Sequence, residues 1–426
     1  MILIYKFLTT IFYPFFCIYI YYRKLKKKED PNRFKEKIFS SHIKANRQVN
    51  KKLIWFHAAS IGELKSIIPI IKKLEKSLKN LEFLVTTVTL SSSNLAKDEL
   101  KKIRNSHHRF LPIDVNFLIE KFYKEWRPNA IFLVDSEIWP NLILNSRKLR
   151  VPIAIINARF TLSSSKKWMM FPKTAKTIFE VFNLFICSSI KTKNFLEKLN
   201  IKNVYYKGNI KLVDQTNETK IVDVNENYLF KKRFWLAAST HEEEDLFCIQ
   251  THLKLKERFS DISTIIAPRH IERSKKIKSL SEKYNLKVQV LNKNEVILDS
   301  REIIIINYFG YLQNYFKFAK SVFIGKSMIK KLQNAGGQNP IEAAKFNCKI
   351  YNGPYVSNFE EIYKILEENN ISKTIFNYDQ LSENLIDDLA LPRKKNSEIA
   401  DTINNLGQKT LNDTMKLINN FLNEIN

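Results

Sequence analysis

Short runs of β-branched and aromatic residues alternate with longer amphipathic stretches along most of the chain. In the first half, these runs predict strands at 53–57, 83–88, 130–134, 152–156, 184–187 and 203–206. A second series predicts strands at 234–239, 262–268, 287–291, 302–306, 321–325 and 348–352. Helical patterns separate the strands, for example over 63–79 and 115–126. This order predicts an α/β protein with two doubly wound, Rossmann-like domains, each built on a parallel sheet with helices on both faces.

The length of 426 residues also favours two domains over a single core. The two strand series would be joined near 208–225. We therefore divide the chain into residues 1–28, 29–212 and 213–426. Doubly wound sheets bind ligands outside the carboxyl ends of their strands, so the site is expected there, in the cleft between the two domains.

The first 22 residues are apolar apart from Lys6 and a few hydroxyl groups, and a basic run follows at 23–28. About 20 apolar residues in a helix are enough to cross a bilayer. No small-residue cleavage site follows, so we expect a retained N-terminal membrane-anchor helix rather than a removed signal peptide. The cations and tyrosines at its end place the body of the protein on the cytoplasmic side. A segment lying in the membrane interface is the alternative, because Pro14 and Lys6 interrupt a clean span.

The chain has a formal net charge of +27, four scattered cysteines and only eight glycines. The charge is compatible with nucleic acid, an anionic membrane or a phosphorylated substrate, but Lys, Asn and Ile are frequent everywhere, as in a compositionally biased genome. The cysteine spacing suggests neither a disulfide framework nor a zinc site. The few glycines are expected where the backbone needs a positive φ or a close approach.

The strand at 53–57 runs into the sequence AASIGE, in which Gly62 permits a tight turn and Glu63 lies in the first turn of a helix. Ser60 and Glu63 have the spacing of a capping box. A helix N-terminus favours the ionised carboxylate, which weakens it as a base. A capping role and a catalytic role for Glu63 both remain open on spacing alone.

The strand at 130–134 is followed by Asp135 and Glu137, which the two-residue period of a strand places on the same side. Two carboxylates at this edge suit acid–base or electrostatic work, and a solvated loop with a helix cap is the alternative. A turn at Gly208 closes the first series. Lys211 after it would face the cleft between the domains, although most lysines in so basic a chain are ordinary surface charges.

In the second series, Thr240 and Glu243 are spaced as a helix cap. The strand at 262–268 ends in Pro268, and Arg269 behind it suits a phosphate through bidentate, charge-assisted hydrogen bonds. The sequence Gly-Lys-Ser at 325–327 is not a P-loop, because Lys320 stands where the first glycine of that motif is required.

The most specific local pattern is AGGQNPIE at 335–342. Two glycines make a turn, Asn339 caps a helix, Pro340 takes the first helical position and Glu342 falls at the third. Such a turn presents N–H groups to a phosphate, and a carboxylate one turn further can hold a ribose hydroxyl. The pattern predicts a donor-nucleotide cradle or, alternatively, only a well-formed helix start.

Taken together and in order, these segments resemble the transferases of 3-deoxy-D-manno-octulosonic acid (Kdo), over nearly the whole chain. The motifs that carry the resemblance are YRKLKKKEDPNRFKEK, HAASIGE, TTVT, FLPIDV, DSEIWPNL, NARFTLSS, KGNIK, AASTHEEED, APRHIER, GGQNPIEAA and GPYVSNFEEI. The resemblance implies a two-domain GT-B glycosyltransferase that moves Kdo from CMP-Kdo to the lipid A precursor in lipopolysaccharide core biosynthesis. It also implies inversion at the sugar, no metal ion and no other cofactor.

By matching position, the resemblance makes Glu63 the general base and assigns transition-state stabilisation to Glu137 and Lys211. It gives residues 29–212 to the lipid A precursor and 213–426 to the donor. The expected CMP contacts are Pro268, Arg269, Phe309, Gly310, Tyr311, Asn339, Pro340, Ile341 and Glu342. The implied location is the cytoplasmic face of the bacterial inner membrane.

The chain departs from the family pattern at three places. An acidic-Thr-x-Gly-Glu-Leu stretch is replaced by residues 307–312, which keep the glycine and the leucine. Gly-Gly-Ser has become Gly-Lys-Ser, which puts Lys326 near the expected donor site, and Gly-Gly-His-Asn now contains Gln338. We expect activity to be retained with an altered donor affinity.

Two other functions are compatible with parts of the sequence. A GT-B transferase that uses a different nucleotide sugar would share most of these features. A nucleic-acid-binding module would need Lys and Arg clustered on one face with stacking aromatic residues, whereas the lysines here are dispersed, so no nucleic-acid partner is expected.

Overall fold

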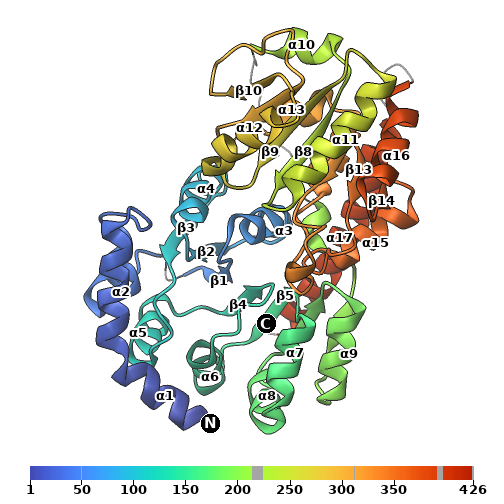
Figure 1. Cartoon of the computed structure of the whole chain (residues 1–426). Helices are drawn as coiled ribbons and strands as arrows, with labels where there is room; N and C mark the ends of the chain where they lie inside the picture. The colour runs from blue at the N-terminus through green and yellow to red at the C-terminus, as the bar shows by residue number, and fades with distance from the viewer. Residues whose placement is uncertain (49, 214–223, 311, 391–396, 425–426) are drawn as a thin grey trace. The chain divides into compact units, whose positions relative to one another are not determined.

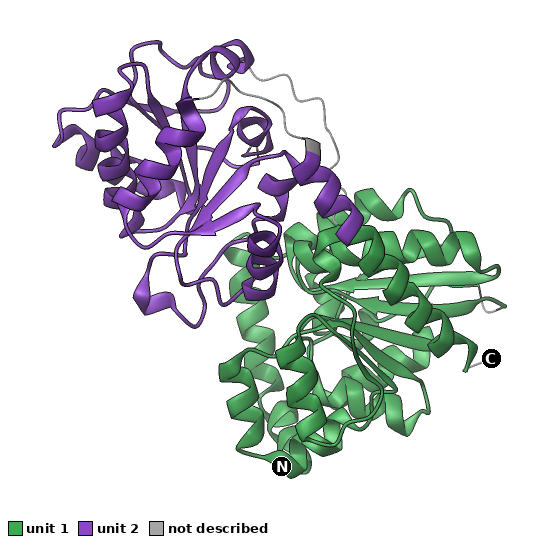
Figure 2. Cartoon of the chain, turned by 90° about the vertical axis from the view of Figure 1, so that its right-hand side faces the viewer, with its two compact units in different colours: residues 1–215, 407–426 green, residues 216–406 purple. Residues whose placement is uncertain are grey.

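The structure is a computed structural model that describes residues 1–48, 50–213, 224–310, 312–390 and 397–424. The chain forms two compact units, one of residues 1–215 with 407–426 and one of residues 216–406 (Figure 2). Each unit is built on one parallel, seven-stranded sheet. The two doubly wound units predicted from the sequence are therefore confirmed.

The sheet of the first unit has the strand order β3-β2-β1-β4-β5-β6-β7. Its strands are β1 (Lys52–His57), β2 (Leu81–Thr87), β3 (Ser106–Phe110), β4 (Ala130–Val134), β5 (Ile153–Ala158), β6 (Leu184–Cys187) and β7 (Val204–Tyr206). The helices are α1 (Ile2–Ile11), α2 (Tyr13–Leu25), α3 (Ile61–Ser77), α4 (Leu90–Leu100), α5 (Asn116–Trp126), α6 (Pro140–Lys148), α7 (Leu162–Met169), α8 (Pro172–Phe179) and α9 (Ile190–Lys198). Single 3₁₀ turns lie at Arg33–Lys37, Ser40–His42 and Ile210–Val213.

Alternate residues of β1 show how this sheet is covered on both faces. Leu53 and Trp55 belong to one buried cluster, and Ile54 and Phe56 belong to another. The strand is apolar along its length because neither face meets water, as is typical of parallel sheets. Helices lie over both faces of the sheet in Figure 1.

The sheet of the second unit has the order β10-β11-β9-β8-β12-β13-β14. Its strands are β8 (Phe234–Thr240), β9 (Ser263–Pro268), β10 (Val288–Leu291), β11 (Ile303–Ile306), β12 (Ser321–Ile324), β13 (Lys349–Asn352) and β14 (Ser372–Thr374). The helices are α10 (Glu226–Lys231), α11 (Glu244–Arg258), α12 (Ser274–Glu282), α13 (Leu312–Phe318), α14 (Ile341–Lys345), α15 (Glu360–Glu368) and α16 (Tyr378–Ala390), with 3₁₀ turns at Ile271–Arg273 and Lys330–Leu332. The last helix, α17 (Ser397–Asn423), belongs to the second unit up to residue 406 and to the first unit from residue 407.

The C-terminal boundary predicted from the sequence, which gave 213–426 to the second domain, is wrong for residues 407–426. The end of α17 carries an apolar stripe that includes Leu411, Ile418 and Phe421, all buried in a core cluster of the first unit. The Phe421 ring packs edge-on against Phe132 of β4, with 5.4 Å between ring centroids. The amphipathic pattern is therefore satisfied by the first sheet rather than by the second.

The N-terminal segment forms two helices and not the single anchor helix expected from the sequence. Helices α1 and α2 are bent by 56° at their junction (Figure 1). Pro14, at the start of α2, lacks an N–H and its ring clashes with the carbonyl four residues earlier, so it ends α1. Within the described residues no single helix is long and apolar enough to cross a membrane, while this bent pair meets the length and composition together.

Candidate active site

In the first sheet, the direction in which successive strands are added reverses between β1 and β4. The chain runs from β1 to β2 and β3 on one side, and returns to β4 on the other. A crevice outside the carboxyl ends of the strands at such a point is the usual ligand site of this architecture. The sequences AASIGE and DSEIWP follow β1 and β4, so the fold brings both motifs to this place.

Glu63 lies in the first turn of α3 and caps it. The Ser60 hydroxyl donates to Glu63 Oε1 at 2.7 Å, and the Ala59 N–H donates to Glu63 Oε2 at 2.8 Å. The Glu63 N–H in turn donates to Ser60 Oγ at 3.4 Å. The capping interpretation of the sequence is therefore confirmed, and it fixes the carboxylate in one orientation.

Although Glu63 caps α3, its pKa is raised above the ordinary value of a glutamate. The side chain is only 9% exposed, and burial is the largest cause of a raised pKa. The negative charges of Asp135 and Glu137 raise the pKa of Glu63 further, while the hydrogen bonds from Ser60 and Ala59 lower it in part. A carboxylate with a raised pKa is better suited to accept a proton near neutral pH.

Asp135 forms the ion pair that holds Lys211. Lys211 Nζ lies 2.5 Å from Asp135 Oδ2, and Asn157 Nδ2 donates to Asp135 Oδ1 at 3.0 Å. Asn157 Oδ1 then accepts the N–H of Ile210, beside Lys211, at 3.1 Å. The lysine is thus a partly buried, paired cation of the first unit and not an ordinary surface charge.

Glu137 is held by two ring nitrogens. Trp139 Nε1 donates to Glu137 Oε2 at 2.8 Å, and His57 Nε2 lies 3.2 Å from the same oxygen. The other nitrogen of His57 lies 2.9 Å from Thr86 Oγ1. The buried His57, at the end of β1, therefore connects Glu137 to the strand next to it.

The reason given from the sequence for pairing Asp135 with Glu137 is wrong. The strand ends at Val134, and Asp135 has a left-handed backbone with φ 61°, so the two-residue period no longer applies. The carboxylates approach Glu63 because the loop after β4 turns. Among the described residues, no group of three or more His, Cys, Asp or Glu side chains is arranged to hold a metal ion.

In the second sheet, the direction in which successive strands are added reverses between β8 and β12. Pro268 ends β9 and is buried, and Arg269 behind it is exposed, with its N–H donating to the Thr240 carbonyl at 3.0 Å. Arg273, in the same motif, has a different role, because its guanidinium pairs with Asp245 and also donates to the Thr240 carbonyl. Within the part of the chain that the structure describes, Arg269 forms no ion pair, whereas Arg273 does.

Glu244 is the main organiser of the loops at this edge, and the sequence analysis missed it. Its buried carboxylate accepts the N–H groups of His241, Lys326, Ser327 and Met328 at 2.7–3.0 Å. The predicted cap of α11 by Thr240 is wrong, since Glu243 takes the N-cap position and the buried Thr240 hydroxyl has no hydrogen-bond partner among the described residues.

The turn at 335–342 forms as predicted, with one shift. Asn339 Oδ1 accepts the N–H of Ile341 at 3.1 Å, but α14 begins at Ile341 and not at Pro340, and has only five residues. Asn339 is exposed, Pro340 and Ile341 are buried, and Glu342 accepts a hydrogen bond from Gln313.

The remaining predicted donor residues follow β11. Phe309 is 61% exposed, and Gly310 has φ 94° with open space where a Cβ would lie. Tyr311 lies outside the described residues. The structure therefore brings Pro268 and Arg269 to one sheet edge with the loops after β8, β11 and β12.

Comparison with known proteins decides which family this fold represents. The family model described as 3-deoxy-D-manno-octulosonic-acid transferase (kdotransferase) matches residues 32–214. The 3-deoxy-D-manno-octulosonic acid transferase of Rickettsia typhi is 31% identical over 89% of this chain and 82% of its own length. The chain belongs to the Kdo transferase family.

Another Kdo transferase agrees with this assignment, and a solved structure shows the fold. The Haemophilus influenzae Kdo transferase is 27% identical over 74% of this chain and 74% of its own length. The UDP-GlcNAc 2-epimerase of Neisseria meningitidis has the same fold, with a TM-score of 0.57 at 13% identity over 88% of this chain and all of that chain. The resemblance stated from the motifs is therefore confirmed, and the protein is a glycosyltransferase with a GT-B-like fold.

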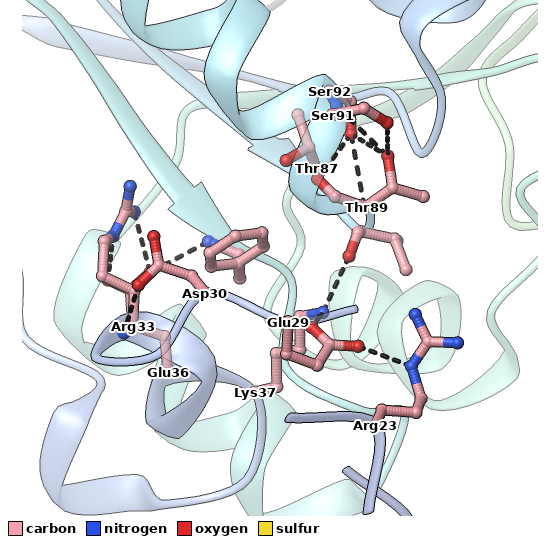
Figure 3. A network of polar contacts seen from close by, with 12 residues as sticks. Arg23, Glu29, Asp30, Arg33, Glu36, Lys37, Thr87, Thr89, Ser91 and Ser92 are labelled. Atoms are coloured by element: carbon pink, nitrogen blue, oxygen red, sulfur yellow. Dashed lines mark hydrogen bonds and ion pairs between the residues drawn. The ribbon is translucent and has the colours of Figure 1, made fainter. Parts of the chain in front are cut away.

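Two motifs of the Kdo transferase resemblance meet in the first unit (Figure 3). Glu29 is buried and pairs with Lys37 and with Arg23, whose Nε lies 2.6 Å away. Lys37 Nζ also donates to the carbonyl of Val88 at 2.7 Å. The segment after α2 is thus attached to the TTVT loop at the carboxyl end of β2.

Proposed function

We propose that this chain transfers Kdo from CMP-Kdo to the acylated, phosphorylated glucosamine disaccharide of the lipid A precursor, with Glu63 as the general base. The observation that carries the proposal is the buried Glu63 carboxylate with a raised pKa at the switch point of the first sheet, in a chain that belongs to the Kdo transferase family.

The reaction is a single displacement with inversion. Glu63 accepts the proton of an acceptor hydroxyl, the hydroxyl oxygen bonds to the anomeric carbon of Kdo, and the bond from that carbon to the phosphate oxygen breaks. CMP leaves with the electron pair. The fixed orientation of Glu63, held by Ser60 and Ala59, keeps one carboxylate oxygen in place for this transfer.

Lys211 and Glu137 stabilise the transition state as the charge moves to the leaving phosphate. Asp135 positions the Lys211 ammonium, and His57 with Trp139 positions the Glu137 carboxylate. Preorganised charges of this kind need no rearrangement during the reaction.

The donor binds at the carboxyl edge of the second sheet. We assign CMP contacts to Pro268, Arg269, Phe309, Gly310, Tyr311, Asn339, Pro340, Ile341 and Glu342, of which Tyr311 is placed by sequence only. The leaving group carries a single phosphate, which the free Arg269 guanidinium can neutralise, so we propose transfer without a metal ion or other cofactor.

Membrane attachment is proposed through α1 and α2. Their outward residues are apolar and well exposed, including Leu3, Phe7 and Phe15. Their other side is tied to the first unit, since Tyr5 OH donates to Asp114 Oδ2 at 2.9 Å. This arrangement favours a segment lying in the interface of the bacterial inner membrane, on its cytoplasmic face, with Lys26 and its neighbours at the lipid head groups.

The test is to incubate the purified protein with CMP-Kdo and a tetraacyl lipid A precursor and to weigh the lipid product by mass spectrometry. We expect a lipid heavier by one or more Kdo residues, together with free CMP. A folded preparation that yields no such lipid would refute the proposal. Parallel reactions with other nucleotide sugars test the alternative donor, which membership of the Kdo transferase family disfavours.

A further inference from the structure

Lys326 has a backbone conformation that is unusual for a lysine. It follows β12 and has φ 61°, in the left-handed region. Side chains with a Cβ are disfavoured there, and the residues that adopt it routinely are Gly, Asn and Asp. Contacts of the surrounding loops must therefore hold Lys326 in this conformation.

Neighbouring groups hold the backbone of Lys326 on both sides. Its N–H donates to the buried Glu244 carboxylate at 2.7 Å, and its carbonyl accepts the N–H of Gly337 at 2.6 Å. The adjacent Ser327 N–H donates to the same carboxylate at 2.9 Å. The loop is therefore fixed by hydrogen bonds of its backbone.

The ammonium of Lys326 has no carboxylate partner within ion-pair distance among the residues that the structure describes. The Glu244 carboxylate beside its backbone already accepts four N–H groups, including that of Lys326 itself. Burial is the largest cause of a lowered pKa at His241, and the positive charges of Lys326 and Arg273 lower it further, while the hydrogen bond with the Ser239 carbonyl raises it in part. Arg273 is neutralised by Asp245, whereas Lys326 and the exposed Arg269 are not.

Lys326 and Arg269 lie where the strands on either side of β8 end. β8 lies between β9 and β12 in the sheet, and Arg269, His241 and Lys326 follow β9, β8 and β12. The strand order reverses between β8 and β12, and Lys326 follows β12, so it lies at the point of reversal where ligands usually bind in this architecture. Two positive charges at this edge attract an anion more strongly than either would alone.

We propose that Lys326 is a donor-specificity residue that binds an oxyanion of the sugar nucleotide, either its phosphate or the carboxylate of its sugar. The inference rests on the proposed function, because CMP-Kdo carries both groups. It adds a contact that the Gly-Gly-Ser sequence of the family pattern cannot make. The strained lysine is kept because its charge contributes to donor binding.

The test compares Lys326→Gly and Lys326→Met with wild type by equilibrium binding of CMP-Kdo, CMP and cytidine. Glycine suits the left-handed backbone, so Lys326→Gly preserves the loop, and Lys326→Met keeps the length of the side chain. Lys330→Met is the matched control, since Lys330 is exposed in the same segment. Thermal unfolding of each variant confirms that it is folded.

We expect both Lys326 variants to bind CMP-Kdo at least about tenfold more weakly, with cytidine binding and the Lys330→Met control unchanged. An equal loss for CMP identifies the phosphate as the partner, and a loss for CMP-Kdo alone identifies the carboxylate. Wild-type affinity for CMP-Kdo in both variants, or an equal loss for cytidine, would overturn the inference while leaving Kdo transfer intact. If wild-type protein transfers no Kdo and binds no CMP-Kdo, the proposed function fails and this inference fails with it.

Discussion

Gly62 is the glycine for which the fold gives no steric reason. Seven of the eight glycines either have a positive φ or leave no room for a Cβ, which would approach a neighbouring atom within 3 Å. A Cβ on Gly62 would meet nothing within 4 Å, and its φ lies outside the left-handed region. Gly62 directly precedes Glu63, so under the proposed mechanism we expect the acceptor to approach the base through the open space beside Gly62.

Gly62→Ala is therefore expected to change stability and activity in opposite directions. Alanine in place of a helical glycine stabilises the fold by about 0.5–1 kcal/mol. A methyl group in the volume that the acceptor occupies costs about 1–3 kcal/mol. That cost lowers kcat/KM for the lipid acceptor by about 5- to 150-fold.

The assay combines thermal unfolding with steady-state transfer at saturating CMP-Kdo and varied acceptor. Gly407→Ala serves as the control, because its Cβ would lie 2.8 Å from the Leu212 carbonyl and should destabilise the protein. If Gly62→Ala is as active as wild type toward the acceptor, or if it unfolds at a lower temperature, the acceptor does not lie against this residue and the reasoning is refuted.

Three further outcomes are expected. Asp135→Asn removes a negative charge that raises the pKa of Glu63, and it also frees the Lys211 ammonium. The base then stays ionised to lower pH, so the acid limb of the pH–rate profile should move to lower pH. A limb that stays in place or moves to higher pH would contradict this. Transfer should continue at the same rate in EDTA, and a loss restored by Mg²⁺ would disprove metal independence. Glu244→Ala leaves four buried or partly buried N–H groups without their acceptor. It should destabilise the second unit by at least about 2 kcal/mol, which chemical denaturation would show as a lower midpoint. An unchanged midpoint would contradict the organising role of Glu244.

The central strands could be predicted because they are buried on both faces. β4 and β11 are continuous apolar runs, and their predicted and observed ranges nearly coincide. The edge strand β3 was missed because its sequence, SHHRF, is polar and only partly buried. β14 was missed because its three residues, SKT, are all polar, whereas the equally short β7 has the sequence VYY and was predicted.

The site could be predicted one motif at a time, but its connections could not. The motifs predicted Glu63, Glu137 and Lys211 as candidate site residues. The contacts that orient two of them, from His57 to Glu137 and from Asp135 to Lys211, join segments distant in sequence and could not be predicted. His57 did carry a weak signal, as a polar residue ending an otherwise apolar strand.

The expectation that the few glycines lie where the backbone needs a positive φ or a close approach holds for seven of the eight, and the structure gives the physical reason. Among the described residues, most non-glycine positions with a left-handed backbone are taken by asparagine, for example Asn80, Asn157 and Asn285, so glycine remains mainly where a side chain does not fit. Charge was a poorer guide, because lysines occur on every surface, and the structure was needed to separate the paired Lys211 and the unpaired Lys326 from the rest.

The rate of Kdo transfer by Glu63→Gln tests the central claim most directly. Glutamine keeps the shape of the side chain but cannot accept the proton, so the rate should fall by about 10²–10⁴-fold, while CMP-Kdo still binds with wild-type affinity. Transfer at close to the wild-type rate by a folded Glu63→Gln protein would show that Glu63 only caps α3, and the proposed base would have to be abandoned.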